Sequence, residues 1–166
     1  MKVLIVYLSE SGNTEKLAKA IFEGTASSEK EMVSIKDVAG IEGYDVIFIG
    51  FPVQSHSVPV KVEAFAKTLP DGQKVAYFAT HGSMKGGEMA VTAFHHALTI
   101  SKNAVILGTF GCRGQVKQSI VDALLQKAEH RGWALEAQGA AGHPDAADFE
   151  DGKDWARKMI TKARAS

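Results

Sequence analysis

Blocks of apolar residues alternate with polar segments along the chain, in lengths that suit strands and helices in turn. The first block, residues 2–8, consists almost entirely of Val, Ile, Leu and Tyr, which is typical of a strand buried on both faces of a parallel sheet. The next block repeats at the spacing of one helix face, with apolar side chains at Leu17, Ala18, Ile21 and Phe22. A strand followed by a helix is therefore the first predicted unit.

The same alternation continues almost to the end of the chain. Further strands are predicted at 31–35, 44–51, 74–79 and 104–110. Helices are predicted from Pro59, over apolar positions between 89 and 98 and between 116 and 128, and finally at 148–163. Only a short connection, 37–43, separates the second and third strands, so no helix of ordinary length is expected there. Repeated βα units predict an α/β fold with a doubly wound parallel sheet and helices on both faces.

We interpret residues 1–166 as a single domain that carries one embellishing segment, at about 112–145. This segment exceeds the needs of a minimal five-stranded domain. It begins with the predicted helix and continues as a loose Gly/Ala-rich stretch up to His143-Pro144. Two roles remain open for it: simple cover of the sheet, or docking of a partner and covering of a substrate.

Composition and charge limit the classes of partner and the compartment that we expect for this protein. The 19 basic and 19 acidic side chains balance, so no global field attracts nucleic acid or an anionic membrane. The single cysteine, Cys112, excludes an internal disulfide and fits a reducing compartment. The apolar N-terminal run is too short for a secretion signal, and no segment reaches transmembrane length. We therefore expect a cytoplasmic protein without nucleic-acid or membrane partners.

The most informative polar segment is the loop between the first strand and the first helix, residues 9–14. A helix N-terminus offers unpaired N–H groups and partial positive charge, which suit a phosphate. Gly12 lets the backbone approach an anion, and the Ser and Thr hydroxyls can donate to its oxygens. No cationic side chain occurs before Lys16, which indicates a phosphate held as a fixed handle. The alternative is a capping turn without a ligand, because Ser, Asn and Thr are also good N-caps.

The motif Ser9-x-Ser11-Gly12-Asn13-Thr14 after a first strand closely resembles the FMN phosphate loop of the flavodoxin family. Softer matches are Gly50-Phe51-Pro52-Val53, Gly111-Cys112-Arg113-Gly114 and His143-Pro144-Asp145. The resemblance spans essentially the whole chain. It implies a flavodoxin-like five-stranded sheet of order 2-1-3-4-5, the order known for flavodoxin itself, and FMN as the cofactor.

The resemblance also implies which residues hold the cofactor. For the phosphate they are Ser9, Glu10 (through its N–H), Ser11, Gly12, Asn13 and Thr14. For the two sides of the flavin ring they are Pro52, Val53, Gln54, Ser55 and His56, and Thr80, His81, Gly82, Ser83, Gly86 and Gly87. No catalytic residue and no metal site is predicted. His95 and His96 are neighbours in sequence and would point in different directions on a helix.

Three departures from the family pattern bear on function. Many electron-carrying flavodoxins stack the ring between a Trp and a Tyr, whereas here the corresponding positions hold Gln54 and either Met84 or Lys85. Ser55 stands where the family often has glycine, and its Cβ disfavours positive φ. The neutral net charge lacks the acidic bias of many carriers. Trp133, Trp155 and Cys112 are expected to be packing residues.

We therefore expect an FMN-binding protein that shuttles electrons between a reductase and an acceptor enzyme. The alternative is a small FMN-dependent enzyme that uses NAD(P)H to reduce a quinone-type acceptor, which the more open ring environment favours. A third interpretation is a flavodoxin-fold binding module without redox activity.

Overall fold

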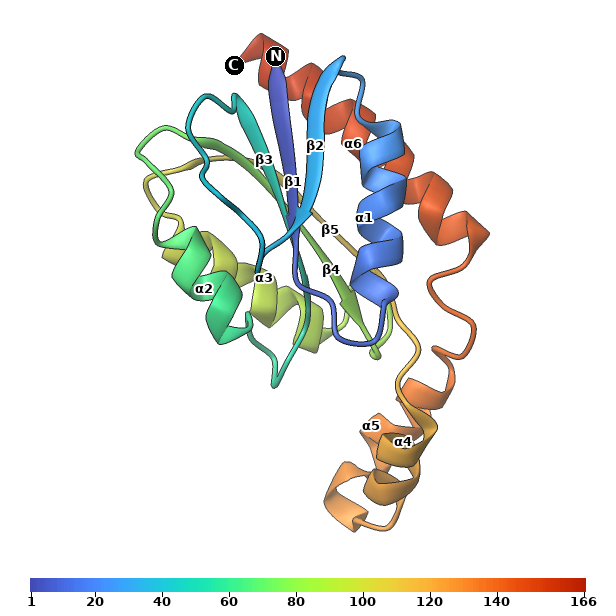
Figure 1. Ribbon diagram of the computed structural model, residues 1–166. Helices are drawn as coiled ribbons and strands as arrows, with labels where there is room; N and C mark the ends of the chain where they lie inside the picture. The colour runs from blue at the N-terminus through green and yellow to red at the C-terminus, as the bar shows by residue number, and fades with distance from the viewer.

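The computed structural model describes residues 1–166 and contains one five-stranded parallel sheet of order β2-β1-β3-β4-β5 (Figure 1). The strands are β1 (Lys2–Tyr7), β2 (Glu29–Ser34), β3 (Val46–Pro52), β4 (Lys74–His81) and β5 (Val105–Arg113). All four strand pairs are parallel. The predicted fold class and strand order are confirmed.

Two pairs of helices cover the sheet. Helices α1 (Asn13–Gly24) and α6 (Ala146–Ala165) pack on one face, and α2 (Val60–Ala66) and α3 (Glu88–Ile100) pack on the other (Figure 1). As expected, the connection between β2 and β3 contains no helix. None of the helices combines the length and the apolar character needed to cross a membrane.

The two faces of the sheet bury separate hydrophobic clusters, because successive side chains of a strand point to opposite faces. Strand β1 contributes Val3 and Ile5 to the cluster under α1 and α6, and Leu4 and Val6 to the cluster under α2 and α3. All four side chains are at most 1% exposed. The continuous apolar strands of the sequence are thus strands buried on both sides.

The segment after β5 differs from the expectation. It forms α4 (Gln118–Leu125), a 3₁₀ turn η1 (Ala128–His130) and α5 (Arg131–Gln138). The expectation of a loose Gly/Ala-rich stretch is wrong over α5, whose buried residues are only Ala134 and Ala137. Two alanines and a half-buried Trp133 give a weak helical pattern, and Gly132 in the first turn weakens it further.

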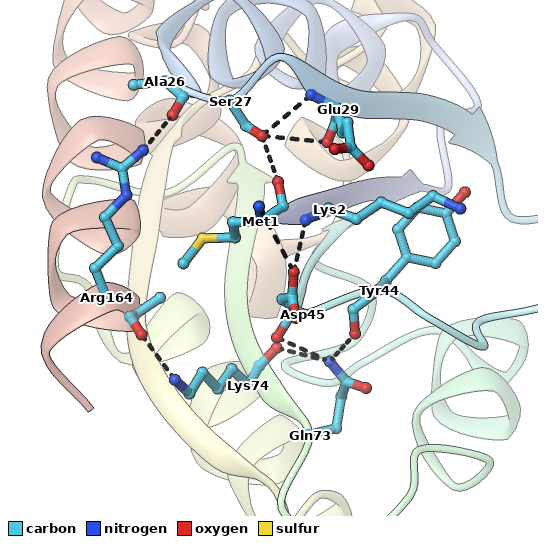
Figure 2. Close-up of polar contacts among 11 residues, drawn as sticks. Met1, Lys2, Ala26, Ser27, Glu29, Tyr44, Asp45, Gln73, Lys74 and Arg164 are labelled. Carbon is cyan, nitrogen blue, oxygen red and sulfur yellow. Dashed lines mark hydrogen bonds and ion pairs between the residues drawn. The ribbon is translucent and has the colours of Figure 1, made fainter.

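The edge of the sheet where β1 and β2 begin is held by a polar network (Figure 2). Asp45 accepts a 2.6 Å hydrogen bond from the Lys2 N–H. Arg164 at the end of α6 donates to the Ala26 carbonyl at 2.9 Å, and Lys74 donates to the Ala163 carbonyl at 2.7 Å. The last two contacts fasten the end of α6 to β4 and to the connection between α1 and β2.

Candidate functional site

The loop between β1 and α1 presents a row of free backbone donors. The N–H groups of Glu10 and Ser11 have no partner, and Asn13 and Thr14 belong to the first turn of α1, where no intrahelical acceptor exists. Gly12 takes φ +91°, a left-handed conformation that lets the chain turn into the helix, and its N–H bonds the Ser9 hydroxyl oxygen at 3.2 Å. The geometry is that of an anion-binding helix N-terminus.

Contacts from β4 and from the segment after β5 hold this loop in place. The Thr14 hydroxyl is buried and hydrogen-bonds the Thr80 hydroxyl at 2.9 Å, so it faces the protein rather than the open loop. The Asn13 amide donates to the Gln115 carbonyl at 3.0 Å. These two side chains therefore position the loop, and the backbone N–H groups are left to bind the anion.

A cavity of about 420 Å³ opens on this loop. It is lined by Glu10, Ser11, Asn13, Lys16, Gln115, Val116 and Lys117. Two ammonium groups, on Lys16 and Lys117, therefore flank the predicted phosphate site. Lys117 was missed from sequence because it lies more than a hundred positions from the loop and belongs to no motif. Only the path of the chain after β5 reveals it.

A larger cavity of about 1050 Å³ lies next to the first, and Val116 lines both. Its volume is at the upper end of the range for small-molecule sites, roughly 300–1000 Å³. The remaining lining residues come from the loops after β3 and β4, from the start of α3 and from the α4–α5 segment: Val53, Gln54, Ser55, His56, Gly82, Ser83, Met84, Gly87, Glu88, Met89, Ile120, His130, Trp133 and Glu136.

Seven of the residues assigned to the flavin ring line this cavity, and four do not. Val53, Gln54, Ser55, His56, Gly82, Ser83 and Gly87 line it. Pro52 and Thr80 lie in the sheet, and Thr80 supports the phosphate loop instead. His81 and Gly86 line a different cavity, of about 290 Å³, between α3 and β5.

The His81 ring is 4% exposed, and its Nε2 atom is buried without a partner. Its Nδ1 atom lies 3.0 Å from the Ser83 carbonyl oxygen. Burial lowers the pKa of His81 below its ordinary value, because the charged ring would lose its hydration. A neutral His81 is therefore part of the packing between β4 and β5.

The loop after β3 closes as a two-residue turn. The N–H of Gln54 bonds the Ser57 carbonyl at 3.1 Å, and the N–H of Ser57 bonds the Gln54 carbonyl at 2.8 Å. Ser55 has φ +48° and His56 has φ +60°, as a type I′ turn requires. Ser55 therefore adopts the positive φ that its Cβ disfavours, because the two hydrogen bonds of the turn hold the conformation.

Side chains of the α4–α5 segment reach both the cavity and its loops. The Glu136 carboxylate accepts a hydrogen bond from the Met84 N–H. Separately, the loops after β3 and β1 are joined to each other, because the Gln54 side-chain amide donates to the Glu10 carboxylate at 3.2 Å.

Cys112 is fully buried in the core, and burial raises the pKa of its thiol to about 12. It is an inert packing residue.

Three potential metal ligands, on His143, Asp145 and Asp148, lie within 4.8 Å of one another outside these cavities. Their side-chain atoms already form hydrogen bonds that cap the N-terminus of α6. Asp145 and Asp148 form a capping box, and the His143 Nδ1 atom lies 2.6 Å from Asp148 Oδ2. The cluster thus has a structural role in the absence of any ion.

The arrangement suits a ligand with a phosphate at one end and a flat ring at the other. The free N–H groups and the two lysines would hold the phosphate, and the larger cavity would take the ring. The site lies where the strand order reverses between β1 and β3, the position at which open parallel sheets bind ligands. Fold and site together define a nucleotide-binding α/β protein of the doubly wound class.

The comparison with known families is specific. The family model described as the flavodoxin domain matches residues 4–157, so the chain belongs to the flavodoxin family. A relative from Clostridioides difficile (strain CD3), the flavodoxin-like domain-containing protein BilS, is 26% identical over 175 residues, with 98% of each chain covered. FMN, the flavodoxin cofactor, agrees with the free donors and the cavity described above.

Solved structures confirm the fold. A flavodoxin from the domain Archaea superposes with a TM-score of 0.65 at 18% identity, covering 99% of both chains. A flavoprotein from Lactobacillus acidophilus, solved in complex with FMN, superposes with a TM-score of 0.55 at 20% identity, covering 74% of this chain and 97% of its own.

Proposed function

We propose that this flavodoxin-family protein carries electrons between a reductase and an acceptor enzyme, with FMN as its redox group. The observation that carries the proposal is the pair of adjacent cavities, one at the free N–H groups of the loop before α1 and a larger one beside it, with Val116 lining both. The FMN in the Lactobacillus flavoprotein supports the identity of the ligand. The flavin supplies the electron chemistry when bound.

The residues of this chain have distinct tasks in that role. The N–H groups of the first loop orient the phosphate, and Lys16 and Lys117 balance its charge. The larger cavity, of about 1050 Å³, is called the ring cavity from here on, and it is bounded on two sides by residues 54–56 and 82–84. At the mouth, Met84 is 62% exposed and Ile120 is 45% exposed, which gives a partner protein an apolar surface to contact.

One observation favours the alternative, a small enzyme that passes electrons from NAD(P)H to a quinone-type acceptor. The ring cavity, at about 1050 Å³, is large enough to admit a second flat molecule beside the cofactor. In the carrier the same space would stay open to a partner protein.

Stopped-flow absorbance of the FMN-loaded protein separates these functions. For a carrier, NADPH alone leaves the flavin band unchanged over minutes, and a catalytic amount of an NADPH-dependent flavodoxin reductase bleaches it within seconds. Rapid bleaching by NADPH alone, followed by recovery on addition of a quinone, would overturn the carrier in favour of the enzyme. Failure of the purified protein to bind FMN would overturn both.

A further inference from the structure

The segment of α4, η1 and α5, residues 118–138, which we call the hairpin, covers no part of the sheet. It extends beyond the edge at which the strands end (Figure 1). The hairpin has a small hydrophobic cluster of its own, built on Val121, Ala134 and Ala137, with Leu124, Leu125, Val116 and Trp133 packed against it. Simple sheet cover, one of the two roles left open by the sequence, is therefore excluded by its position.

Three contacts fix the second helix of the hairpin against the ring cavity. Arg113, the last residue of β5, donates to the Glu136 carbonyl at 2.7 Å. The Glu136 carboxylate accepts from the Met84 N–H in the loop after β4. Gly82, in the same loop, packs against α5, since an added Cβ would lie 3.7 Å from the Ala137 Cβ atom. The hairpin is thus attached to the loop that borders the cavity.

These contacts hold Trp133, in the first turn of α5, at the wall of the ring cavity. It lines the ring cavity, and its Cζ2 atom would lie 3.6 Å from a Cβ on Gly82. Its indole Nε1 atom is buried without a hydrogen-bond partner. Trp133 is also the only Phe, Tyr or Trp among the residues that line the cavity. The two loops that bound the cavity offer Gln54, Ser55, His56 and Met84 instead.

We propose that Trp133 supplies the aromatic contact for the flavin ring, so that the hairpin builds a wall that the loops after β3 and β4 do not provide. The inference rests on the proposed binding of FMN. It assigns to the hairpin a role in cofactor binding, and it changes the interpretation of Trp133 from a packing residue to a ligand contact.

The test uses the emission of bound FMN, because an indole must touch a flavin to quench its fluorescence efficiently. In the wild-type protein we expect bound FMN to be nearly dark. Trp133→Phe should brighten it several-fold, and Trp133→Tyr, which keeps a readily oxidised ring of almost the same size as Phe, should leave it dim. Loss of the indole contact should also weaken FMN binding by about 3- to 10-fold. Trp155→Phe is the matched control, since Trp155 packs against Phe48 and Phe110 in the core.

The outcomes are distinguishable. Equal FMN affinity and equal emission in wild type, Trp133→Phe and Trp133→Tyr would overturn the inference while leaving FMN binding intact. No FMN binding by the wild type would overturn the proposed function itself. If Trp133→Phe loses its thermal transition, Trp133→Leu, which also removes the quencher, takes its place beside Trp155→Phe: brighter emission in Trp133→Leu alone supports the contact at 133, and emission as dim as in the wild type contradicts it.

Discussion

At the scale of single residues, Ser55 and His56 hold a conformation that few side chains accept. Each non-glycine residue in the left-handed region costs about 1–2 kcal/mol, and here two occur in succession. The sequence could not show this, because the usual signal for a type I′ turn, Asn-Gly, is missing. The strain is located at the wall of the ring cavity.

Replacing Ser55 with glycine should relieve part of that strain. We expect Ser55→Gly to raise the free energy of unfolding by about 1 kcal/mol, or the melting temperature by about 2–4 °C. Ala64→Gly, on the exposed side of α2, is the control and should lower stability by about 1 kcal/mol, since glycine is unfavourable in a helix. Thermal and urea unfolding measure both. Destabilisation by Ser55→Gly would show that the turn is not strained.

His81 makes stability depend on pH. The folded protein holds the ring neutral because burial lowers its pKa, whereas the unfolded chain binds a proton near the ordinary value of about 6.5. The contribution is therefore complete above pH 6.5 and is lost as the pH falls. Urea unfolding at pH 7.5 and 5.5 should show a smaller loss of stability in His81→Gln than in the wild type. His95→Gln, at an exposed position of α3, should keep the wild-type loss, and equal losses in all three would contradict the role of His81.

At the scale of elements, those that bury a large apolar face are the ones that a sequence pattern reveals. Strands β1, β3 and β4 bury nearly every side chain and were easily predicted. Helix α5 was missed because it packs two alanines and one tryptophan against a short partner rather than against the sheet. An isolated hairpin needs few large apolar residues, so its sequence resembles a loop.

The contact between Gly82 and Val116 should couple the loop after β4 to the segment that leads from β5 into the hairpin, since Val116 packs against the cluster of the hairpin. Gly82→Ala would place a methyl group 2.6 Å from Val116 Cγ2 and should cost about 1–3 kcal/mol of stability. In the double variant with Val116→Ala the added methyl group finds room, so the combined cost should fall clearly below the sum of the single costs. Gly132→Ala in α5, where an added methyl group meets nothing within 4 Å, should be neutral or stabilising. Simple additivity of Gly82→Ala and Val116→Ala would argue against the coupling.

At the scale of the whole molecule, the proposed phosphate site combines segments that are remote in sequence. Residues 9–16 begin the fold, and residues 115–117 follow the last strand, yet both line one cavity. The motif after β1 points to the first segment as a candidate. The second could not be predicted, because its place depends on how the chain after β5 returns across the ends of the strands.

Lys117 should therefore contribute to binding of the phosphate but not of the ring. We expect Lys117→Gln to weaken FMN binding by about 2- to 5-fold, the effect of one partly solvated charge, and to leave riboflavin binding unchanged because riboflavin has no phosphate. The effect on FMN should shrink at high salt. Lys127→Gln, at an exposed residue that lines no described cavity, is the control. Equal weakening of FMN and riboflavin would place Lys117 near the ring instead.

The polar network at the starting edge of the sheet has a practical consequence for experiments. Both chain termini lie at that edge, while the hairpin lies at the other (Figure 1). Residues of the hairpin line the ring cavity, which therefore lies on the side away from the termini. A tag, a fusion partner or a surface linker attached to either terminus would hold the molecule by its closed edge. The protein could thus be attached to an electrode, or fused to a donor enzyme, through either terminus, and the ring cavity would still face solution.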